Sequence, residues 1–327
     1  MTAESRPAGA RSNLALWSTR VGRKTLYAVS LWVGVLVGSF LLFQVAPGDP
    51  ARRILGSDAS EEAVQRLRHE LGTDRPLSAQ FSSRLVELGR FSLGRSVIDG
   101  RSVATDVGEK FLVTARLAIL SSVISLLVSY LVNFVAYYFR RPWLIGITKL
   151  GAAVPTYCTG VLAALLFGVL LPIVPLTGYG TASAGWTALL LPAFVAAAGP
   201  TALMAAVLAE KVNAESTEGY ARTAKAYGFS PGRIFHQTLL PAVWVSWLTA
   251  WVNQLSVLFV ASFVLEIIFT IPGTGVLLVR AIQEKDYPIL QGVLLWNAAF
   301  FIAVSWTSAA LFSWLDPRLR TDELATI

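Results

Sequence analysis

The sequence predicts an all-α integral membrane protein with six transmembrane helices and with both termini on the cytosolic side. The first observation is composition: 54% of the 327 residues are hydrophobic and only 14% are charged, whereas about a quarter of the residues of a soluble domain are charged. The second is that long uncharged runs separate the charges, and each run is long enough to cross a bilayer. Because a chain in lipid must satisfy its own backbone hydrogen bonds, these runs are expected to be helices.

The chain opens with a polar, basic segment, residues 1–24, which is typical of the flank of a signal anchor or of a disordered cytosolic tail. Residues 25–46 carry no charge and form the first predicted transmembrane helix, TM1. This run is longer than the apolar part of a cleavable signal peptide, and no small-residue cleavage site follows it. The Pro-Gly-Asp-Pro sequence at 47–50 then ends the helix, since proline cannot continue it.

Residues 47–110 form a long polar insertion, which is predicted to lie outside the cytosol. Its ten acidic and ten basic residues balance, which argues against a nucleic-acid partner. Ser60, followed by two acidic residues, predicts a helix over 60–71 that ends at Gly72, and a second short helix is expected over 80–88. With His69 as its one histidine, the insertion lacks the convergent acid, base or metal ligands that an enzyme needs.

Five further crossings, TM2–TM6, follow from the remaining uncharged runs and make up a membrane core at residues 111–316. The stretch 150–209 has no charge over 60 residues, which is too long for one crossing and fits two, with a Pro/Gly-rich break at 172–185. The other runs are 117–139, 237–265 and 287–315. A short tail, residues 317–327, ends the chain.

The basic residues of the short loops set the predicted orientation. Arg140 and Arg141 follow the second run, and a charged island at 210–241 carries further lysines and arginines, whereas the hairpin at 172–185 has none. Short cytosolic loops are enriched in Lys and Arg. The island and both tails are therefore placed in the cytosol, and the insertion at 47–110 is placed outside.

The predicted spans contain few residues that could bind a metal or carry a proton. A transition-metal site is not expected from one cysteine, Cys158, and two histidines. The ionisable residues nearest to the runs, Arg116 and Glu266, lie toward run ends, whereas an ion-driven carrier usually keeps such groups inside its spans. The chain is therefore expected to lack its own energy coupling for transport. An ion-coupled carrier and a membrane-embedded enzyme are the alternatives from other classes.

Three amides within the runs are the polar candidates for a translocation path: Asn133, Asn253 and Gln254. The competing interpretation for each is a hydrogen bond between helices, a common use of such residues in membrane bundles.

The charged island at 210–241 predicts two short helices joined at a glycine. Gly228 stands where a helix ends in a left-handed turn. Ser230 and Pro231 then read as an N-cap and the first residue of the next helix. Such a short element buries little by itself, so it is either a solvated connector or a projection that docks into a groove of a partner.

Seven short segments occur in order along the chain: F-Q-V-A-P-G-D-P (43–50), L-G-T-D-R-P-L (71–77), F-S-L-G-R-S (91–96), Y-A-R-T-A-K-A-Y-G-F-S (220–230), I-F-T-I-P-G-T-G (268–275), D-Y-P-I-L-Q-G (286–292) and L-D-P-R-L-R (315–320). With these segments, the chain resembles the permease subunits of peptide-type ATP-binding-cassette importers, the oligopeptide/dipeptide/nickel permease family. The resemblance covers about 25–320, and the single long loop after the first helix is similar to that of the first-type permease of each pair.

The resemblance implies a type I importer transmembrane domain in which the island is a coupling loop that contacts the ATPase. The coupling residues are Tyr220, Ala221, Arg222, Thr223, Ala224, Lys225, Ala226, Tyr227, Gly228, Phe229 and Ser230. The resemblance implies that the I-F-T-I-P-G-T-G segment after Glu266 lies at an outer gate, and a plain membrane-exit loop is the alternative. The gate residues are Glu266, Pro272, Gly273 and Gly275. The chain departs from the family pattern at Thr238, where an aliphatic residue is expected, at Tyr227, where a basic residue is common, and at Leu112, where proline is common.

The resemblance also implies the partners. These are a second homologous permease subunit, two ATP-binding-cassette ATPase subunits or one fused ATPase, an extracytoplasmic solute-binding protein and membrane lipid, with no nucleic acid. No catalytic residue, metal or cofactor is expected in this chain, because ATP and Mg belong to the ATPase subunits. The expected location is the bacterial cytoplasmic (inner) membrane, as a multi-pass protein. Di- and oligopeptides are the leading solutes, with nickel or other metal chelates and glycans as alternatives.

Overall fold

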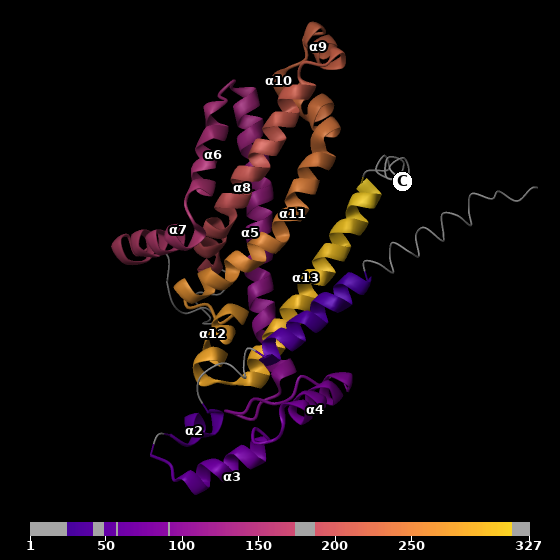
Figure 1. Ribbon diagram of the computed structural model, residues 1–327. Helices are drawn as coiled ribbons and strands as arrows, with labels where there is room; N and C mark the ends of the chain where they lie inside the picture. The colour runs from indigo at the N-terminus through magenta and orange to yellow at the C-terminus, as the bar shows by residue number, and fades with distance from the viewer. Residues whose placement is uncertain (1–24, 42–48, 57, 91, 174–186, 316–327) are drawn as a thin grey trace, which may run out of the picture. The chain divides into compact units, whose positions relative to one another are not determined.

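The computed structural model describes residues 25–41, 49–56, 58–90, 92–173 and 187–315, and it is helical almost throughout (Figure 1). The chain divides into two compact units. The insertion unit comprises Met1–Val103 and Glu284–Ala303, and the core unit comprises Ala104–Gln283 and Val304–Ile327. The predicted tails 1–24 and 317–327, the end of TM1 at 42–46, and most of the turn at 172–185 lie outside the described residues.

Four helices of the described chain are long and apolar enough to cross a membrane, judged by length and composition. They are Val103–Tyr138, Thr187–Glu215, Pro231–Ile268 and Tyr287–Ser308. Two shorter apolar helices, Thr25–Leu41 and Thr156–Leu170, fall on the other predicted crossings. The all-helical prediction is therefore confirmed at the level of four membrane-length helices.

The predicted caps within the insertion unit are confirmed. Helix α3, Glu61–Leu71, begins with the Ser60 hydroxyl accepting a hydrogen bond from the amide of Ala63, and it ends at Gly72 in the left-handed conformation. Helix α4, Leu77–Gly89, covers the second predicted helix and begins three residues earlier, directly after Pro76. Local capping thus sets both ends of α3.

A shorter helix, α2 (Pro50–Leu55), packs against α3 through an ion pair. Asp49 caps α2 by accepting a hydrogen bond from Ala51, and the same carboxylate accepts two from the Arg68 guanidinium, at 2.7 and 2.9 Å. Burial raises the pKa of Asp49, but the hydrogen bonds from Arg68 and Ala51 prevail and hold that pKa below its ordinary value. The Asp49 carboxylate therefore serves two elements at once, α2 and α3.

Buried polar contacts fasten the insertion to the start of α13 (Tyr287–Leu315) within the same unit. The Ser96 hydroxyl donates to the Asp286 carboxylate, which also caps α13 by accepting from Ile289. Arg84 donates to the side-chain oxygen of Gln291 at 2.6 Å. Burial raises the pKa of Asp286, while the hydrogen bonds from Ser96 and Ile289 partly offset that rise. The segments F-S-L-G-R-S and D-Y-P-I-L-Q-G are far apart in sequence and are thus joined by the hydrogen bond from Ser96 to Asp286.

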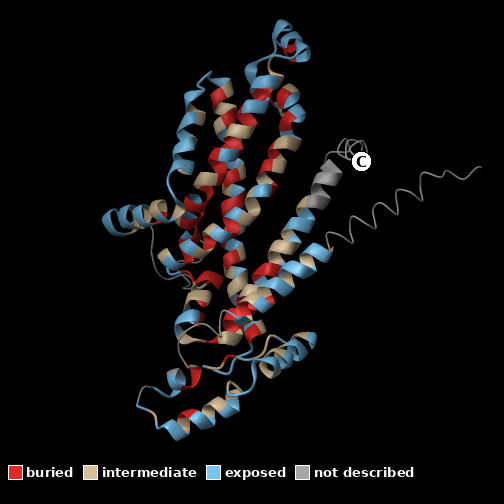
Figure 2. Cartoon of the chain, viewed as in Figure 1, coloured by how far each residue is buried: buried red, intermediate tan, exposed pale blue. Residues whose placement is uncertain are grey.

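In the core unit, the long helices α5 (Val103–Tyr138), α8 (Thr187–Glu215) and α11 (Leu240–Ile268) run side by side, and their facing sides are buried (Figures 1 and 2). Helix α5 begins at Val103, inside the predicted insertion 47–110. Residues 103–110 therefore continue the second span as helix, although their charges led us to place them in the insertion. Where the bilayer begins along α5 stays a prediction.

The uncharged stretch predicted to hold the third crossing is broken in the structure. Helix α6, Trp143–Ala153, ends at Val154, which is extended, and Pro155 then starts α7, Thr156–Ala163. The residue before a proline is pushed out of the helical region by the proline ring. Helix α7 turns away from α6 (Figure 1) and continues as a π-helical stretch, Ala164–Leu170. Charge patterning alone concealed this break.

Two hydrogen bonds from tryptophans join α11 to α5 inside the core unit. The indole of Trp247 donates to the Ser129 hydroxyl at 3.2 Å, and the indole of Trp251 donates to the Ser122 hydroxyl at 2.8 Å. The Asn133 amide donates to the Ala205 carbonyl of α8 at 3.1 Å. Hydrogen bonds of this kind between membrane helices contribute about 0.6 kcal/mol each on average. They supplement the close packing of the buried apolar side chains.

The substitution Gln291→Leu tests the attachment of the insertion to α13. It removes the acceptor of Arg84 and leaves a buried charged donor short of a partner, which costs about 1–3 kcal/mol. We expect local opening of residues 77–103 to increase, with roughly tenfold faster tryptic cleavage there in the detergent-purified protein. Gln65→Leu, at an exposed position of α3, is the matched control. Equal cleavage rates in both variants would contradict the proposed attachment.

Candidate functional site

The predicted coupling loop forms the described end of the core unit that projects beyond α8 and α11 (Figure 1). Helix α9, Gly219–Ala226, ends at Tyr227. Gly228 follows with φ of 76°, the left-handed conformation predicted from sequence. The amide of Gly228 bonds the Lys225 carbonyl and the amide of Phe229 bonds the Ala224 carbonyl. These two bonds form a Schellman motif, which closes the helix and reverses the chain.

The element after the turn is longer than predicted. Ser230 caps α10, Pro231–Ile234, by accepting a hydrogen bond from Arg233, and Pro231 occupies the first helical position. Instead of ending, α10 passes through a π-helical stretch, Phe235–Leu239, into α11. The loop is therefore continuous with a membrane-length helix. A displacement of the turn at Gly228 would therefore act directly on helix α11.

Small residues hold α9 against the core. Ala221 and Ala224 are buried in a cluster with Met204, Leu208 and Phe235, and this cluster also receives tyrosine and phenylalanine side chains from α5. The ring of Phe235 lies 5.4 Å from that of Phe134, edge to face. The alanines allow α9 to approach closely, and the aromatic cluster fixes the end of α11 beneath it.

The other predicted coupling residues face outward. Tyr227 is 77% exposed and Tyr220 is 46% exposed. The remaining exposed members of the set are Arg222, Thr223, Lys225, Ala226, Gly228, Phe229 and Ser230. Ala224 lies on the buried side of α9, whereas Tyr220 and Tyr227 lie on its exposed side. A large aromatic and basic surface is therefore available on an element that is itself firmly seated (Figure 2).

Two contacts brace this surface against the end of α8. The Tyr220 hydroxyl donates to the Glu215 carboxylate, and the Lys225 ammonium donates to the Ser216 carbonyl. The hydrogen bond to Glu215 raises the pKa of Tyr220 to about 12. The phenol therefore stays un-ionised at any physiological pH and remains a donor to the carboxylate. The guanidinium of Arg233 lies over the Phe229 ring at 3.9 Å.

The predicted outer-gate residues come together around the start of α12, Thr274–Glu284. The first amides of a helix lack partners within the helix. Here two other helices supply them: the Thr114 hydroxyl of α5 accepts from the amide of Thr274 at 2.9 Å, and the Glu266 carboxylate of α11 accepts from the amide of Gly275 at 2.7 Å. A carboxylate is also favoured there by the positive end of the helix dipole.

The glycines of the I-P-G-T-G segment are explained by this arrangement. A Cβ on Gly273 would lie 2.2 Å from the Glu266 carboxyl group, and a Cβ on Gly275 would lie 2.7 Å from the backbone of Phe263. Glu266 is fully buried, and one of its carboxyl oxygens has no hydrogen-bond partner among the described residues. The segment thus folds tightly over a buried acid, more like a closed joint than a plain exit loop.

The three path candidates have different surroundings. Asn133 is buried and bonds the Ser129 and Ala205 carbonyls, so its amide is used between helices. Asn253 is exposed and Gln254 is half-buried on α11. Their assignment to a translocation path stays a prediction. Among the described residues, no group of three His, Cys, Asp or Glu side chains is placed to hold a metal ion.

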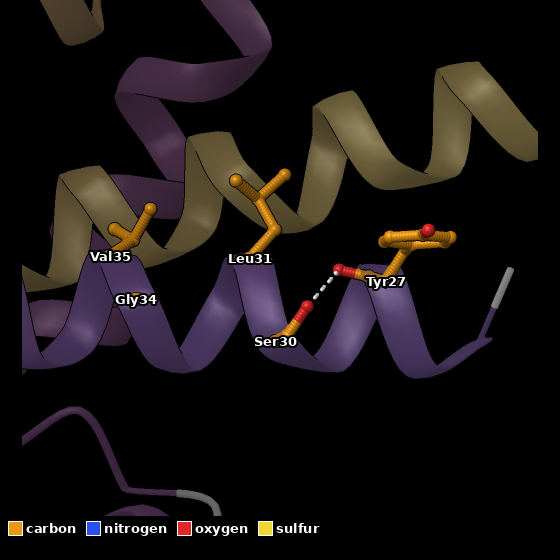
Figure 3. A pocket seen from close by; sticks show the side chains of 5 residues that line it. All are labelled: Tyr27, Ser30, Leu31, Gly34 and Val35. Carbon is orange, nitrogen blue, oxygen red and sulfur yellow. Dashed lines mark hydrogen bonds between the residues drawn. The ribbon is translucent and has the colours of Figure 1, made fainter. Parts of the chain in front are cut away.

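A hollow on the described surface does not resemble a solute site. It has a volume of about 540 Å³ and is lined by Tyr27, Ser30, Leu31, Gly34 and Val35 (Figure 3). All five come from the helix Thr25–Leu41, and the Ser30 hydroxyl is bonded to the carbonyl of Tyr27. A shallow apolar hollow on one helix lacks the converging polar groups of a binding pocket.

Comparison with known families decides the identity of the chain. Residues 122–321 match the model of the inner membrane component of binding-protein-dependent transport systems, and residues 20–118 match the N-terminal membrane component of such systems. The chain belongs to this family. It is therefore the multi-pass inner-membrane permease of a binding-protein-dependent ATP-binding-cassette importer, not itself an enzyme, and the family works with ATPase and binding-protein partners.

Related permeases align over nearly their whole length. A peptide transport system permease protein of Brucella abortus (strain 2308) is 34% identical over 308 residues, which cover 92% of this chain and 98% of the relative. The glutathione transport system permease protein GsiC of Escherichia coli (strain K12) is 29% identical over 300 residues, which cover 90% of this chain and 95% of the relative. The predicted resemblance to peptide-type importer permeases is confirmed.

Sequence reasoning missed several residues of the site. Thr114 gives no signal in the sequence, because its role depends on where α12 meets α5. Ser122 and Ser129 were also overlooked, although they recur at seven residues, a spacing that places both on one side of a helix. A search for polar residues with helical spacing inside the uncharged runs would have found this pair.

The substitutions Gly273→Ala and Gly275→Ala, each made with and without Glu266→Ala, test the joint at α12. We expect both alanines to lower the melting temperature of the detergent-purified permease, because each Cβ meets an occupied space. Removing the Glu266 side chain frees the space beside Gly273 but not the backbone contact at Gly275. The cost of Gly273→Ala is thus expected to shrink to below about 1 kcal/mol in the Glu266→Ala background, with non-additivity typical of touching residues.

The Gly275→Ala variant is the internal control of this cycle, and its cost is expected to persist in both backgrounds. Equal costs of Gly273→Ala with and without Glu266 would show that the carboxyl group is not packed against Gly273.

Proposed function

We propose that this permease pairs with a second homologous permease to form a pathway for di- or oligopeptides, or for similar small solutes such as glutathione, delivered by an extracytoplasmic binding protein. Two ATPase subunits, or one fused ATPase, bind at the coupling loop and supply the work. The observation that carries this proposal is the structure of the coupling loop. Helix α9 packs against the core unit through Ala221 and Ala224, and its aromatic and basic side is exposed to solvent.

The coupling role follows from how the loop is built. Closure of an ATPase dimer around ATP moves whatever is lodged in its groove, and a packed element transmits that movement as a rigid body. The Schellman turn at Gly228 and the continuous passage from α10 into α11 link such a movement to a membrane helix. A solvated connector does not require buried alanines beneath an exposed pair of tyrosines.

The six-crossing arrangement is part of the same proposal. The four membrane-length helices account for the second, fourth, fifth and sixth crossings. The helix Thr25–Leu41 begins the first crossing, and the interrupted pair α6 and α7 forms the third. With the coupling loop in the cytosol, both termini are cytosolic, and the insertion at 47–110 faces outward where a binding protein docks.

The outer gate is assigned to the joint at α12. This segment lies at the end of α11 opposite the coupling loop and contains the predicted gate residues Glu266, Pro272, Gly273 and Gly275. Thr114 fastens it to α5. Because one helix start is capped by residues of two different helices, relative movement of α5 and α11 has to disturb it. We infer that opening of the pathway to the outside loosens this joint.

The solute class rests on the names of the relatives, which handle peptides or glutathione. Nickel or other metal chelates and glycans are the alternatives. Co-purification of the partner binding protein with its bound solute, followed by mass spectrometry, distinguishes these classes directly.

The proposed function is tested by assembling the permease with its second permease, ATPase and binding-protein partners in proteoliposomes. We expect solute-stimulated ATP hydrolysis and ATP-dependent uptake of labelled peptide or glutathione. Uptake driven by a proton gradient in liposomes that contain this permease alone would overturn the proposal and favour an ion-coupled carrier.

The substitution Tyr227→Ala tests whether the exposed face of the loop is a docking surface. The side chain is 77% exposed, so its loss is expected to leave the melting temperature of the isolated permease unchanged. In the assembled transporter, loss of an aromatic anchor costs about 2 kcal/mol or more, and we expect ATP-dependent uptake to fall at least tenfold. Tyr27→Ala, at another exposed tyrosine, is the control. Normal uptake by Tyr227→Ala would favour the solvated connector.

A further inference from the structure

Helix α11 carries a row of polar side chains that the described chain leaves without partners. Ser246, Thr249, Asn253 and Ser256 follow one another at intervals of three, four and three residues, which places them on one face of a helix. Asn253 is exposed and the other three are half-buried. None of the four side chains makes a hydrogen bond to another described residue. We call these four residues the α11 polar stripe.

Other polar side chains in the spans of the core unit behave differently. The hydroxyls of Ser121, Ser125 and Ser262 bond carbonyls of their own helices. The two tryptophans on the opposite side of α11 donate to serines of α5. Pairing is therefore the rule where α11 meets its neighbours, and the α11 polar stripe departs from it.

The stripe also differs from the exposed faces of the neighbouring helices. Helix α5 exposes Leu112, Ile119, Val123, Leu127 and Leu131. Helix α8 exposes Leu190, Phe194 and Leu203. Such side chains suit contact with lipid. A free amide does not, because an unsatisfied polar group in hydrocarbon costs several kcal/mol. The α11 polar stripe therefore faces something other than lipid tails.

The side of α11 that carries the stripe changes from polar to apolar along the helix, although α11 also exposes Ala242 and Trp244 near the coupling loop. The stripe ends at Ser256, and beyond it the exposed side chains are apolar: Val257, Val260, Val264 and Ile267. The polar half is continuous with the coupling loop, and the apolar half leads to the joint at α12. A water-filled inner half and a dry, closed outer half account for this division, whereas contact with lipid penalises the polar half.

We propose that the α11 polar stripe lines the inner half of the solute pathway and contacts the amide groups of a peptide. This inference deepens the proposed function and rests on it. The stripe offers both donors and acceptors and no charge: each hydroxyl both donates and accepts, and the Asn253 amide does the same. Peptide amides present the same two kinds of group, whatever their side chains. Single hydrogen bonds between uncharged groups hold a peptide weakly, and weak binding suits a pathway that the solute must leave.

The single cysteine of the chain, Cys158, makes the stripe accessible to a direct test. In a Cys158→Ser background, single cysteines replace Ser246, Thr249, Asn253 and Ser256 in the assembled transporter, which is prepared in inside-out vesicles. A membrane-impermeant, negatively charged methanethiosulfonate is the probe. We expect each of the four thiols to react at least tenfold faster than cysteines placed at Val264 and at the lipid-facing position Leu127.

Trialanine in the vesicle medium is expected to slow modification at Asn253→Cys at least threefold, whereas sucrose at the same millimolar concentration has no such effect. Four thiols as unreactive as the Leu127→Cys control would overturn the inference and place the stripe against the second permease or lipid. Reactive thiols that trialanine does not protect would also overturn it, because the peptide contact would be absent.

ATP-dependent uptake of labelled trialanine by the Cys158→Ser parent separates this inference from the proposed function. If the parent takes up trialanine but the stripe thiols are unreactive, only this inference is refuted and the proposed function stands. No ATP-dependent uptake of any peptide or glutathione by the parent, in the presence of all partners, refutes the proposed function first.

Discussion

A polar group inside a bilayer has to find a partner, because hydrocarbon offers none, and this constraint accounts for the specific polar contacts between the long helices of the core unit. Apolar packing between helices is poorly directional in lipid, since lipid tails are as apolar as the side chains. The tryptophan–serine bonds between α11 and α5 and the Asn133 amide between α5 and α8 supply the direction. They fix which faces of the long helices meet.

The same constraint shapes the two ends of α11. At one end, Glu266 and Thr114 satisfy the first amides of α12, and the glycines at 273 and 275 are required because the acid and the backbone of Phe263 occupy the neighbouring space. At the other end, the chain leaves the membrane and the constraint lapses, so Tyr220 and Tyr227 turn outward over buried alanines. One helix thus connects the joint at α12 to the exposed coupling loop, which we propose as a docking face, with the unpartnered polar stripe between them.

The sequence predicted elements whose cause is local. Ser60 and Gly72 bound α3 as expected, and Gly228 and Ser230 shape the coupling loop through turn and capping chemistry that a few neighbouring residues determine. The uncharged runs predicted the membrane helices, because the length of an apolar run can be read from the segment itself. The family motifs were recognisable because each is a short, contiguous string of residues.

What the sequence concealed depends on tertiary contacts. Thr114 has no distinguishing neighbourhood until α12 is placed beside α5, and the pairing of Ser96 with Asp286 joins residues 190 positions apart. The start of α5 at Val103 was masked by charges that a helix carries equally well before it enters lipid. The break at Pro155 was hidden because the run on both sides is uncharged. In each case the missing information is which other segment lies opposite.

The most direct test of this account is a structure of the assembled transporter in a lipid nanodisc, with its binding protein and without nucleotide. The account predicts that the polar groups left without partners in the single chain acquire them from specific neighbours. Tyr227 and Gly228 lie in a groove of an ATPase subunit, and Asn253 faces ordered water or solute. A structure in which the coupling loop touches no ATPase and Asn253 faces lipid would contradict it.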